Sequence, residues 1–329
     1  MTPDPALPAD DHPFLSRAEP RAPERLLAQA RGLGRPPRVA LVNAGAPIPL
    51  QGLREACEAG LAEPILLGDL PKIDAAAEAI GWDVRPFRRV SAPGDTAAPA
   101  AARLAAGGEA DAVMKGQVHT STFLKGLLPS ALGLRPKGAV CGHVFHITVP
   151  GSDRPLMLTD AALNVAPDVP TRQACLSHAV HLAGLVGVER PHVGLLAPSE
   201  DVTAGVPSTG EAACIAAWAK GALKRAVVEG PLALDLILSR RAAALKGVDS
   251  RVAGNADIIV VPEITTGNAL FKLMTLGMGA CAAGVVMGAR VPILLTSRSQ
   301  GPEDRLASAA LGAIVATDAR AARGALAAE

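Results

Sequence analysis

Short apolar runs alternate with amphipathic segments along most of the chain, starting near residue 38. Runs of Val, Ile, Leu and Ala predict buried strands, and the segments between them repeat apolar residues at the spacing of one helix face. In the first half we predict strands at 38–42, 64–67, 84–90 and 110–114, and helices at 50–61, 72–80, 96–106 and 123–128. This alternation of strand and helix predicts a parallel sheet with helices on both faces.

The pattern changes between residues 140 and 158, where two apolar runs lie close together. The runs 140–149 and 155–158 are joined by a Pro-Gly-Ser-Asp turn, so they predict a hairpin or two neighbouring strands. Alternation then resumes, with strands predicted at 192–196, 226–229, 257–261 and 284–287, helices at 171–186, 208–222, 232–246, 267–278 and 303–315, and a tail at 321–328. We therefore place a domain boundary near 140–150 and interpret residues 1–36 as a mobile arm with a short helix around 23–32.

The stretch 291–304, VPILLTSRSQGPED, joins a buried strand to a helix start. Ser297 and Arg298 follow the apolar run, and Pro302 and Asp304 are typical of the first helical turn. Ser297 and Arg298 should thus lie at the carboxyl end of a strand, facing the positive end of a helix. Anions bind well in such a place, and the arginine side chain matches the oxygens of a phosphate.

Four other turns share this form, in which an apolar strand runs into small, hydroxyl or amide residues. They are 114–122, 158–164, 229–235 and 261–268. If these strands belong to one sheet, their carboxyl ends meet at one edge and several of the turns converge. The hydroxyls of the first turn, Thr120 among them, could instead be ordinary helix caps. A capping box at Ser208–Glu211 is sufficient to explain those two residues.

Composition narrows the classes of function. The formal net charge is +1 and aromatic residues make up 2% of the chain, with no Tyr, so the chain lacks the basic field and the stacking rings of nucleic-acid binders. No run of about 18 apolar residues predicts a membrane span, and the N-terminus lacks the apolar region of a signal peptide. Five scattered cysteines without a C-x-x-C spacing are typical of reduced thiols, so we expect a cytoplasmic protein.

Motifs for metal ions and nucleotides are missing. The sequence has no P-loop, no complete dinucleotide fingerprint and no H-E-x-x-H, so we expect no metal site. His143 and His146 are three residues apart in a predicted strand, and side chains at that spacing face opposite sides. They cannot chelate one metal, and we interpret both as structural.

Taken together, six segments make the chain resemble the phosphate acetyl/butyryltransferase family, that is, the phosphotransacetylases and phosphotransbutyrylases. They are, in order, MKGQVHTSTFLKGLL, PLMLTDAALNVAPD, APSEDVTAGVPSTGEA, VEGPLALD, ADIIVVPEITTGNALFKLMT and GARVPILLTSRS. The resemblance covers about residues 38–318, and the MKG and LTSR segments are closer to the butyryltransferase-like branch.

The resemblance implies two α/β domains of parallel or mixed sheet flanked by helices, with a cleft between them, as in isocitrate and isopropylmalate dehydrogenases. The first domain would be discontinuous, 37–145 plus 290–329, and the second would be 146–289. The resemblance also implies a homodimer and the reversible reaction of a short acyl-CoA with phosphate to give acyl phosphate and CoA. Coenzyme A and phosphate would be substrates, and no cofactor would be bound permanently.

The resemblance further implies site residues. Ser297 would stabilise the oxyanion or the phosphate, and Arg298 would bind the phosphate. Asp304, seven residues after Ser297, would be the general base or would only cap its helix; both alternatives stay open. Residues that match segments bordering the cleft, or that could contact an anion there, are Lys115, Thr120, Thr159, Asp160, Asn164, Thr266, Gly267, Asn268 and Lys272.

Two alternatives from other classes remain. A metal- and nicotinamide-dependent dehydrogenase has a related two-domain fold, but the sequence shows no paired metal carboxylates. A non-catalytic protein that binds CoA or another metabolite would keep the cleft, but it would not need Ser297 and Arg298.

Overall fold

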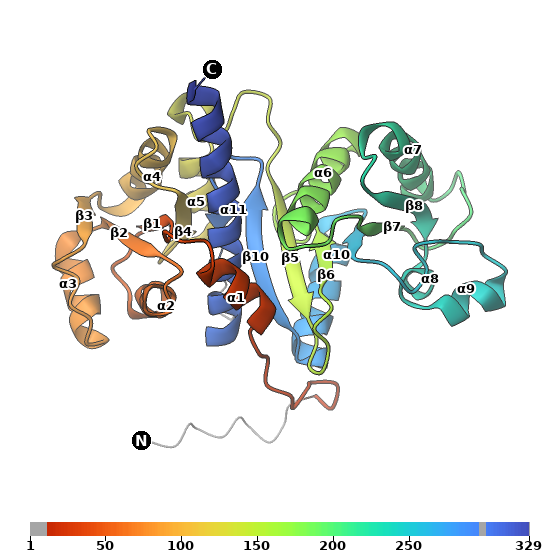
Figure 1. Ribbon diagram of the computed structural model, residues 1–329, viewed down its shortest axis with the longest axis horizontal. Helices are drawn as coiled ribbons and strands as arrows, with labels where there is room; N and C mark the ends of the chain where they lie inside the picture. The colour runs from red at the N-terminus through yellow and green to blue at the C-terminus, as the bar shows by residue number, and fades with distance from the viewer. Residues whose placement is uncertain (1–11, 296–300, 329) are drawn as a thin grey trace.

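The computed structural model of the chain describes residues 12–295 and 301–328. These residues form a mixed α/β fold in which one large sheet is flanked by helices (Figure 1). Within the described residues the sheet has 11 strands, in the order β3-β2-β1-β4-β11-β10-β5-β6-β9-β7-β8. The strands are β1 (Arg38–Val42), β2 (Glu63–Gly68), β3 (Arg88–Ser91), β4 (Ala112–Lys115), β5 (Gly142–Thr148), β6 (Leu156–Thr159), β7 (His192–Leu196), β8 (Val227–Leu232), β9 (Ile258–Val260), β10 (Cys281–Met287) and β11 (Ile293–Leu294).

Helices precede or follow nearly every strand. They are α1 (Glu24–Arg31), α2 (Pro47–Glu58), α3 (Leu70–Ala79), α4 (Ala97–Ala106), α5 (Thr120–Leu127), α6 (Val169–Leu185), α7 (Pro207–Ala222), α8 (Leu234–Leu238), α9 (Arg240–Lys246), α10 (Ile264–Lys272) and α11 (Pro302–Ala328), with short 3-10 turns at Gly94–Thr96 and Ser130–Leu132 and a π-helical turn at Leu273–Gly277. The alternation predicted from the sequence is therefore confirmed.

The sheet consists of two parallel blocks joined by an antiparallel centre. Strands β3, β2, β1, β4 and β11 are parallel to one another, and so are β6, β9, β7 and β8. Between the blocks, β10 is antiparallel to both β11 and β5, and β5 is antiparallel to β6. The two blocks consequently run in opposite directions. The predicted boundary at residues 145 and 146 lies inside β5, in the middle of the continuous sheet, and the division into two domains stays a prediction.

The two faces of the sheet are packed differently. One face, here called the covered face, lies under α1, α2, α3, α6, α7 and α11, and its buried residues form a single core cluster that includes both blocks. Figure 1 views this face, with α11 and α6 in front of the strands. The other face, here called the divided face, has one core cluster under α4 and α5 and a separate one under α8, α9 and α10. The centre of the divided face is thus left between two cores.

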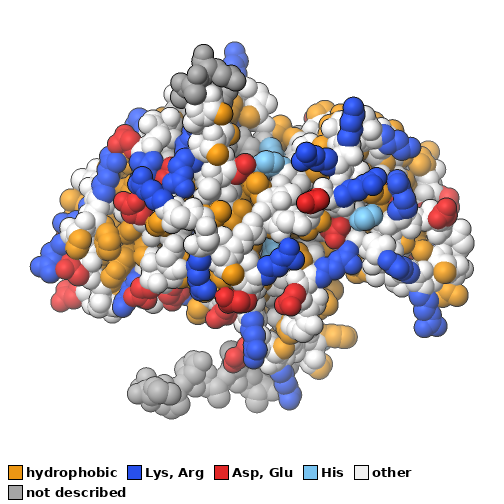
Figure 2. All heavy atoms as spheres, in the orientation of Figure 1, with side chains coloured by type: hydrophobic (Ala, Val, Ile, Leu, Met, Phe, Trp, Pro, Cys, Tyr) orange, Lys and Arg blue, Asp and Glu red, His pale blue; other side chains and the backbone are white. Residues whose placement is uncertain are grey.

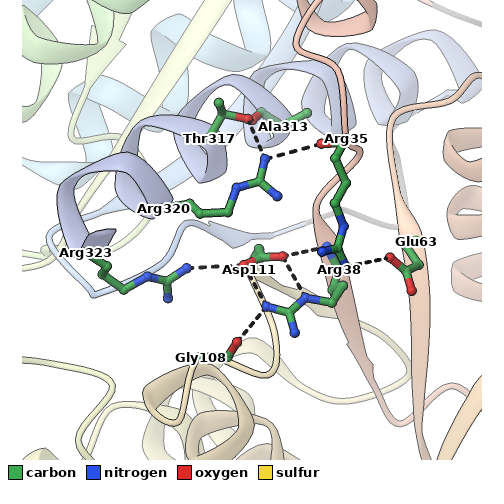
Figure 3. Close-up of polar contacts among 9 residues, drawn as sticks. All are labelled: Arg35, Arg38, Glu63, Gly108, Asp111, Ala313, Thr317, Arg320 and Arg323. Atoms are coloured by element: carbon green, nitrogen blue, oxygen red, sulfur yellow. Dashed lines mark hydrogen bonds and ion pairs between the residues drawn. The ribbon is translucent and has the colours of Figure 1, made fainter. Parts of the chain in front are cut away.

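Polar contacts join the C-terminal part of α11 to the start of the first block (Figure 3). Asp111, which is 1% exposed just before β4, accepts hydrogen bonds from the side chain of Arg38 at 2.9 and 3.1 Å and from that of Arg323 at 3.2 Å. Arg320 donates to the carbonyl oxygen of Arg35 at 3.3 Å. Burial raises the pKa of Asp111, but the hydrogen bonds and charge of Arg38 outweigh it, so the net shift is downward. These contacts pack the last helix against β1 and β4, far earlier in the chain.

Local structure corrects three expectations. The helix expected at 232–246 is two short helices, because Ser239 is extended (φ −136°) and its side chain caps α9 through the N–H of Ala242. The expected capping box at Ser208–Glu211 is wrong: α7 starts at Pro207 and has no side-chain cap, and Glu211 pairs with Arg172 at 3.1 Å. The last helix is continuous from Pro302 to Ala328, so the tail belongs to it.

The surface carries both signs of charge. On the face shown in Figure 2, lysine and arginine side chains lie among aspartate and glutamate side chains, in agreement with the formal net charge of +1. In the described part of the chain, no helix has both the length and the apolar character that crossing a membrane requires.

Candidate active site

A cavity of about 520 Å³ opens at the centre of the divided face, between α5 and α10. Its walls come from both blocks of the sheet and from the antiparallel centre. The lining residues are Lys115, Val118, His119, Thr120, His143, Phe145, Ala161, Ala162, Ile264, Asn268, Phe271, Lys272 and Leu295. Of the candidates predicted from the sequence, Lys115, Thr120, Asn268 and Lys272 are therefore brought together at one cavity.

The side of the cavity formed by β4 and α5 carries polar groups. Lys115, the last residue of β4, is 8% exposed, and its Nζ donates to the carbonyl oxygens of Gly116 at 3.4 Å and Val118 at 3.2 Å. Thr120 is the first residue of α5, and no described side chain caps that helix end. A helix N-terminus carries unpaired N–H groups and a partial positive charge. This side of the cavity thus combines an ammonium group, a hydroxyl and a helix N-terminus.

The opposite side is formed by α10, whose N-terminus is already occupied. Glu263 accepts hydrogen bonds from the N–H groups of Thr265 at 2.6 Å and Thr266 at 2.7 Å, and from the hydroxyl of Thr266. These hydrogen bonds, with that of the Thr266 hydroxyl the strongest, lower the pKa of Glu263 to about 2. Thr266 therefore serves as a capping partner, and a second anion has no place at this helix end.

Gly267 has a packing role in α10. A Cβ atom at this position would lie 2.8 Å from both the Cα and the Cβ of Ala161, in the turn after β6. Glycine therefore lets the helix approach that turn closely. The next residue, Asn268, and Lys272 at the end of the helix line the cavity, and both are exposed.

The turn after β6 holds three predicted site residues in a hydrogen-bonded network. Asp160, 4% exposed, accepts from the N–H groups of Ala162 and Leu163, both at 2.9 Å, and from the side-chain amide of Asn164 at 2.7 Å. Thr159 is fully buried and donates its hydroxyl to the carbonyl oxygen of His143 at 2.9 Å. These side chains fix the shape of the turn, while Ala161 and Ala162 face the cavity.

The sheet has a notch beside the cavity, because β11 contributes only two residues. Beyond its end, the N–H groups of Ala282 and Gly284 on β10 are paired instead with Asp304 at 2.8 Å and with the hydroxyl of Ser308 at 3.0 Å, both from α11. Asp304 also accepts from the N–H of Gly301 at 3.2 Å. Burial raises the pKa of the Asp304 carboxyl, although these two N–H groups oppose the shift.

Ser297 and Arg298 lie outside the described residues. The last described residue before them is Leu295, which lines the cavity. The first described residue after them is Gly301, whose N–H donates a hydrogen bond to Asp304 at the notch.

Sequence reasoning missed three rings that line the cavity: His143, Phe145 and Phe271. From the sequence we interpreted His143 as structural and expected its side chain and that of His146 to face opposite sides of the sheet. His143 and Phe145 line the cavity on the divided face, whereas Val144 between them belongs to the core of the covered face. Because side chains alternate along the strand, His146 is on the same side as Val144. The scarcity of aromatic residues was a usable signal. Two of the chain's five phenylalanines fall in the segments VCGHVFHITV and NALFKLMT, which border the predicted turns.

A larger hollow, of about 1240 Å³, lies elsewhere, along α6 and the end of α7. It is lined by residues such as His181, Arg190, Lys224 and Arg225, and by none of the predicted site residues. Among the described residues, no group of three His, Cys, Asp or Glu side chains is placed to hold a metal ion.

The fold, the segments around the cavity and their order along the chain define one class of protein. Residues 88–313 match the family model described as phosphate acetyl/butaryl transferase, and the chain belongs to this family. The phosphate acetyltransferase of Rhizobium meliloti is 40% identical over 309 residues, which are 93% of this chain and 97% of that protein. The phosphate butyryltransferase of Clostridium acetobutylicum is 39% identical over 269 residues, 81% of this chain and 89% of that protein.

A solved structure shares both sequence and fold. The crystal structure of a branched-chain phosphotransacylase from Enterococcus faecalis V583 is 29% identical, with a TM-score of 0.72, and covers 85% of this chain and 99% of that one. The family predicted from the sequence is therefore confirmed.

Proposed function

We propose that this chain catalyses the reversible transfer of a short acyl group, acetyl or butyryl, between coenzyme A and inorganic phosphate. The observation that carries the proposal is the cavity on the divided face. It is lined by residues from β4, α5 and α10, and also by Leu295, the last described residue before Ser297 and Arg298. The alternative of a nicotinamide-dependent dehydrogenase loses support, since the chain belongs to an acyltransferase family.

Phosphate binds, in this proposal, on the side of Lys115 and Thr120. The N-terminus of α5 is uncapped there, and a nearby ammonium group adds positive charge. The N-terminus of α10 already holds the carboxylate of Glu263. Of the two helix N-termini at the cavity, that of α5 is therefore the one open to an anion.

The reaction needs one proton transfer and one displacement. Towards acyl-CoA, the thiol of CoA loses its proton, and the thiolate sulfur attacks the carbonyl carbon of the acyl phosphate. The tetrahedral intermediate then releases phosphate as the C–O bond breaks. A free thiol has a pKa of about 8.5, so a nearby base assists at neutral pH. In reverse, a phosphate oxygen attacks the thioester and CoA leaves.

Ser297 and Arg298 complete the site in this proposal, on the basis of the sequence. Ser297 and Arg298 follow Leu295, a residue of the cavity lining, two and three positions later in the sequence. Arg298 would hold the phosphate through a planar pair of N–H donors, and Ser297 would donate to the carbonyl oxygen as it gains negative charge. Asn268 and Lys272 on α10 would contact CoA from the other side of the cavity.

Asp304 is the proposed base. It lies at the notch, where the segment with Ser297 and Arg298 rejoins the described chain, and its raised pKa brings it closer to neutrality. Its hydrogen bonds with Ala282 and Gly301 also give it an anchoring role, which is the second possibility. Thr159, Asp160, Asn164, Thr266 and Gly267 are proposed to support the substrate through the turn and the helix that they shape.

We further propose that the chain acts in the cytoplasm as a homodimer, with its cleft between the units 37–145 plus 290–329 and 146–289. The proposed enzyme keeps no cofactor between turnovers. Size-exclusion chromatography with light scattering measures the oligomeric state, and a mass of one chain would contradict the dimer.

One assay tests the function. Purified protein is incubated with acetyl-, propionyl- or butyryl-CoA, with and without phosphate, and free CoA is measured with a thiol reagent. We expect CoA release that depends on phosphate and on protein. Release at the same rate without phosphate would indicate a hydrolase, and no release at all would indicate a binding protein.

A further inference from the structure

Aromatic side chains are rare in this chain, and two of the phenylalanines line the cavity. The sequence has five Phe, two Trp and no Tyr. Phe145 of β5 and Phe271 of α10 are stacked there, with ring centroids 4.1 Å apart and an interplanar angle of 12°. The ring of His143 lies 4.2 Å from that of Phe145. The three rings form one surface that reaches from β5 to α10, here called the ring wall.

Gly284 of β10 makes room for the ring wall. Gly284 is directly opposite Phe145 in the register of β10 and β5. A Cβ atom at Gly284 would lie 2.8 Å from two atoms of the His143 ring and 3.2 Å from the Phe145 ring. Because Gly284 has no side chain, the rings of His143 and Phe145 pack directly against the backbone of β10 and form the floor of the cavity.

The ring wall is apolar despite its histidine. The Nδ1 atom of His143 is buried and makes no hydrogen bond to a described residue. Burial lowers the pKa of His143 to about 4, although the charge of Asp160 opposes this shift, so the ring is neutral at pH 7. The neutral ring of His143, tilted by 58° against Phe145 and 1% exposed, supports the ring wall from behind and adds no charge.

The cavity therefore has two sides of different chemistry. Lys115 and Thr120 form the polar side, on β4 and α5, and the ring wall with Ala161, Ala162 and Ile264 forms the apolar side, to which Asn268 and Lys272 of α10 add two polar side chains. A thioester or acyl phosphate has the same two parts, a polar reacting end and an apolar chain. An acetyl group is too short to cover the ring wall, whereas a butyryl group adds two methylenes that can lie on it.

We propose that Phe271 and the exposed edge of Phe145, supported by the buried His143, bind the acyl chain and select acyl groups of about four carbons over acetyl. This inference rests on the proposed function and adds its substrate preference. The relatives do not decide the question, since a phosphate acetyltransferase and a phosphate butyryltransferase are almost equally similar to the chain. Burying one methylene changes binding by roughly fourfold, so two methylenes favour butyryl over acetyl by roughly 15-fold.

The test compares kcat/KM for butyryl-CoA and acetyl-CoA, with phosphate as acceptor, in the full chain and in three variants. We expect the unmodified chain to prefer butyryl-CoA by roughly 15-fold. Phe271→Ala, at a half-buried position that should fold normally, removes most of the surface for the chain. Phe271→Ala should lower this preference by about fivefold or more. Phe145→Leu should also lower the preference, but by less.

Phe87→Leu is the matched control. Phe87 also packs on another ring, that of Trp82 at 5.2 Å, and does not line the cavity. Its substitution should leave the preference unchanged. Equal kcat/KM for the two substrates in the unmodified chain overturns the inference, as does an unchanged preference in both Phe271→Ala and Phe145→Leu. In those cases phosphate-dependent CoA release still supports the proposed function, and its absence with every acyl-CoA overturns both.

Discussion

The covered face and the divided face of the sheet carry out different tasks. Helices lie along the whole covered face, and its single core cluster extends from Leu41 in the first block to Val260 in the second. The divided face breaks into two clusters, and the cavity lies between them. Continuous burial stabilises the fold on one side of the same strands, and interrupted burial leaves room for a ligand on the other.

Neighbouring residues of one strand illustrate the difference. In β5, Val144 belongs to the core of the covered face, whereas His143 and Phe145 face the cavity. In β4, Met114 belongs to that core and Lys115 lines the cavity. Because side chains alternate along a strand, each central strand supplies both the fold and the site. Substitutions on the two faces should therefore have separable effects, on stability and on activity.

The largest expected effect is on activity and comes from Arg298→Ala. Loss of a charged, bidentate phosphate contact should lower kcat/KM with phosphate by about 1,000-fold. The midpoint of thermal unfolding should stay within about 2 °C, as expected for a side chain whose proposed role is to bind phosphate. Steady-state kinetics and calorimetry measure the two quantities, and unchanged kinetics would refute the role of Arg298.

The reverse pattern is expected for Leu311→Ala, on the covered face. Leu311 is fully buried in α11, and the cavity left by its side chain should cost about 3 kcal/mol of unfolding free energy. Below the unfolding transition, kcat should change less than about threefold. Urea unfolding and the CoA-release assay measure the two quantities. A large loss of kcat in the folded variant would show that packing on the covered face affects activity, and would contradict the separation of the two faces.

Asp304 of α11 lies at the notch and is not among the residues that line the cavity, so Asp304→Asn separates its two proposed roles. If it is the base, kcat should fall by about 100-fold, while Asn still accepts from Ala282 through its carbonyl oxygen. In the unmodified protein, kcat should also fall as acid protonates this carboxyl, whose pKa burial raises. A change in kcat below about threefold, with a shifted unfolding midpoint, would assign Asp304 to anchoring alone.

The smallest expected effect distinguishes His146 from His143. Burial lowers the pKa of both to about 4, so the folded chain keeps them neutral while the unfolded chain takes up protons below about pH 6.5. Stability should therefore fall as the pH drops from about 6.5 to 4.

His146→Leu should reduce this loss of stability by about 1 kcal/mol and leave kcat/KM unchanged. His143→Leu should also reduce the loss, but it should change the preference for butyryl-CoA over acetyl-CoA. Urea unfolding at pH 7 and pH 5 and the kinetic assay measure both effects. An altered kcat/KM in His146→Leu would contradict the separation of the two faces.

Much of the fold could be predicted because its strands are strongly apolar and short turns follow them. Position in the sheet could not be predicted: β5 and β10 pair across 133 to 145 residues of sequence, for example Thr148 with Cys281 and Gly142 with Met287. Their antiparallel pairing places two opposed blocks in one sheet. The continuous sheet therefore follows from long-range pairing that local periodicity does not encode.

Only those parts of the candidate site that depend on local sequence could be predicted. Lys115, Thr120, Asn268 and Lys272 follow strand ends, and such positions are visible in the sequence. The ring wall depends on Gly284 lying opposite Phe145, which only the pairing of β10 with β5 reveals. Likewise, Asp160 has the residue type of a ligand-binding group, and only its contacts show that it shapes a turn.

The most direct test is a crystal structure with coenzyme A and phosphate bound. We predict that the CoA sulfur lies in the cavity between Lys115 and Phe271, with phosphate near Thr120 and Arg298. CoA bound only in the hollow along α6 and α7, beside Arg190 and Lys224, would contradict the assignment of the site to the divided face.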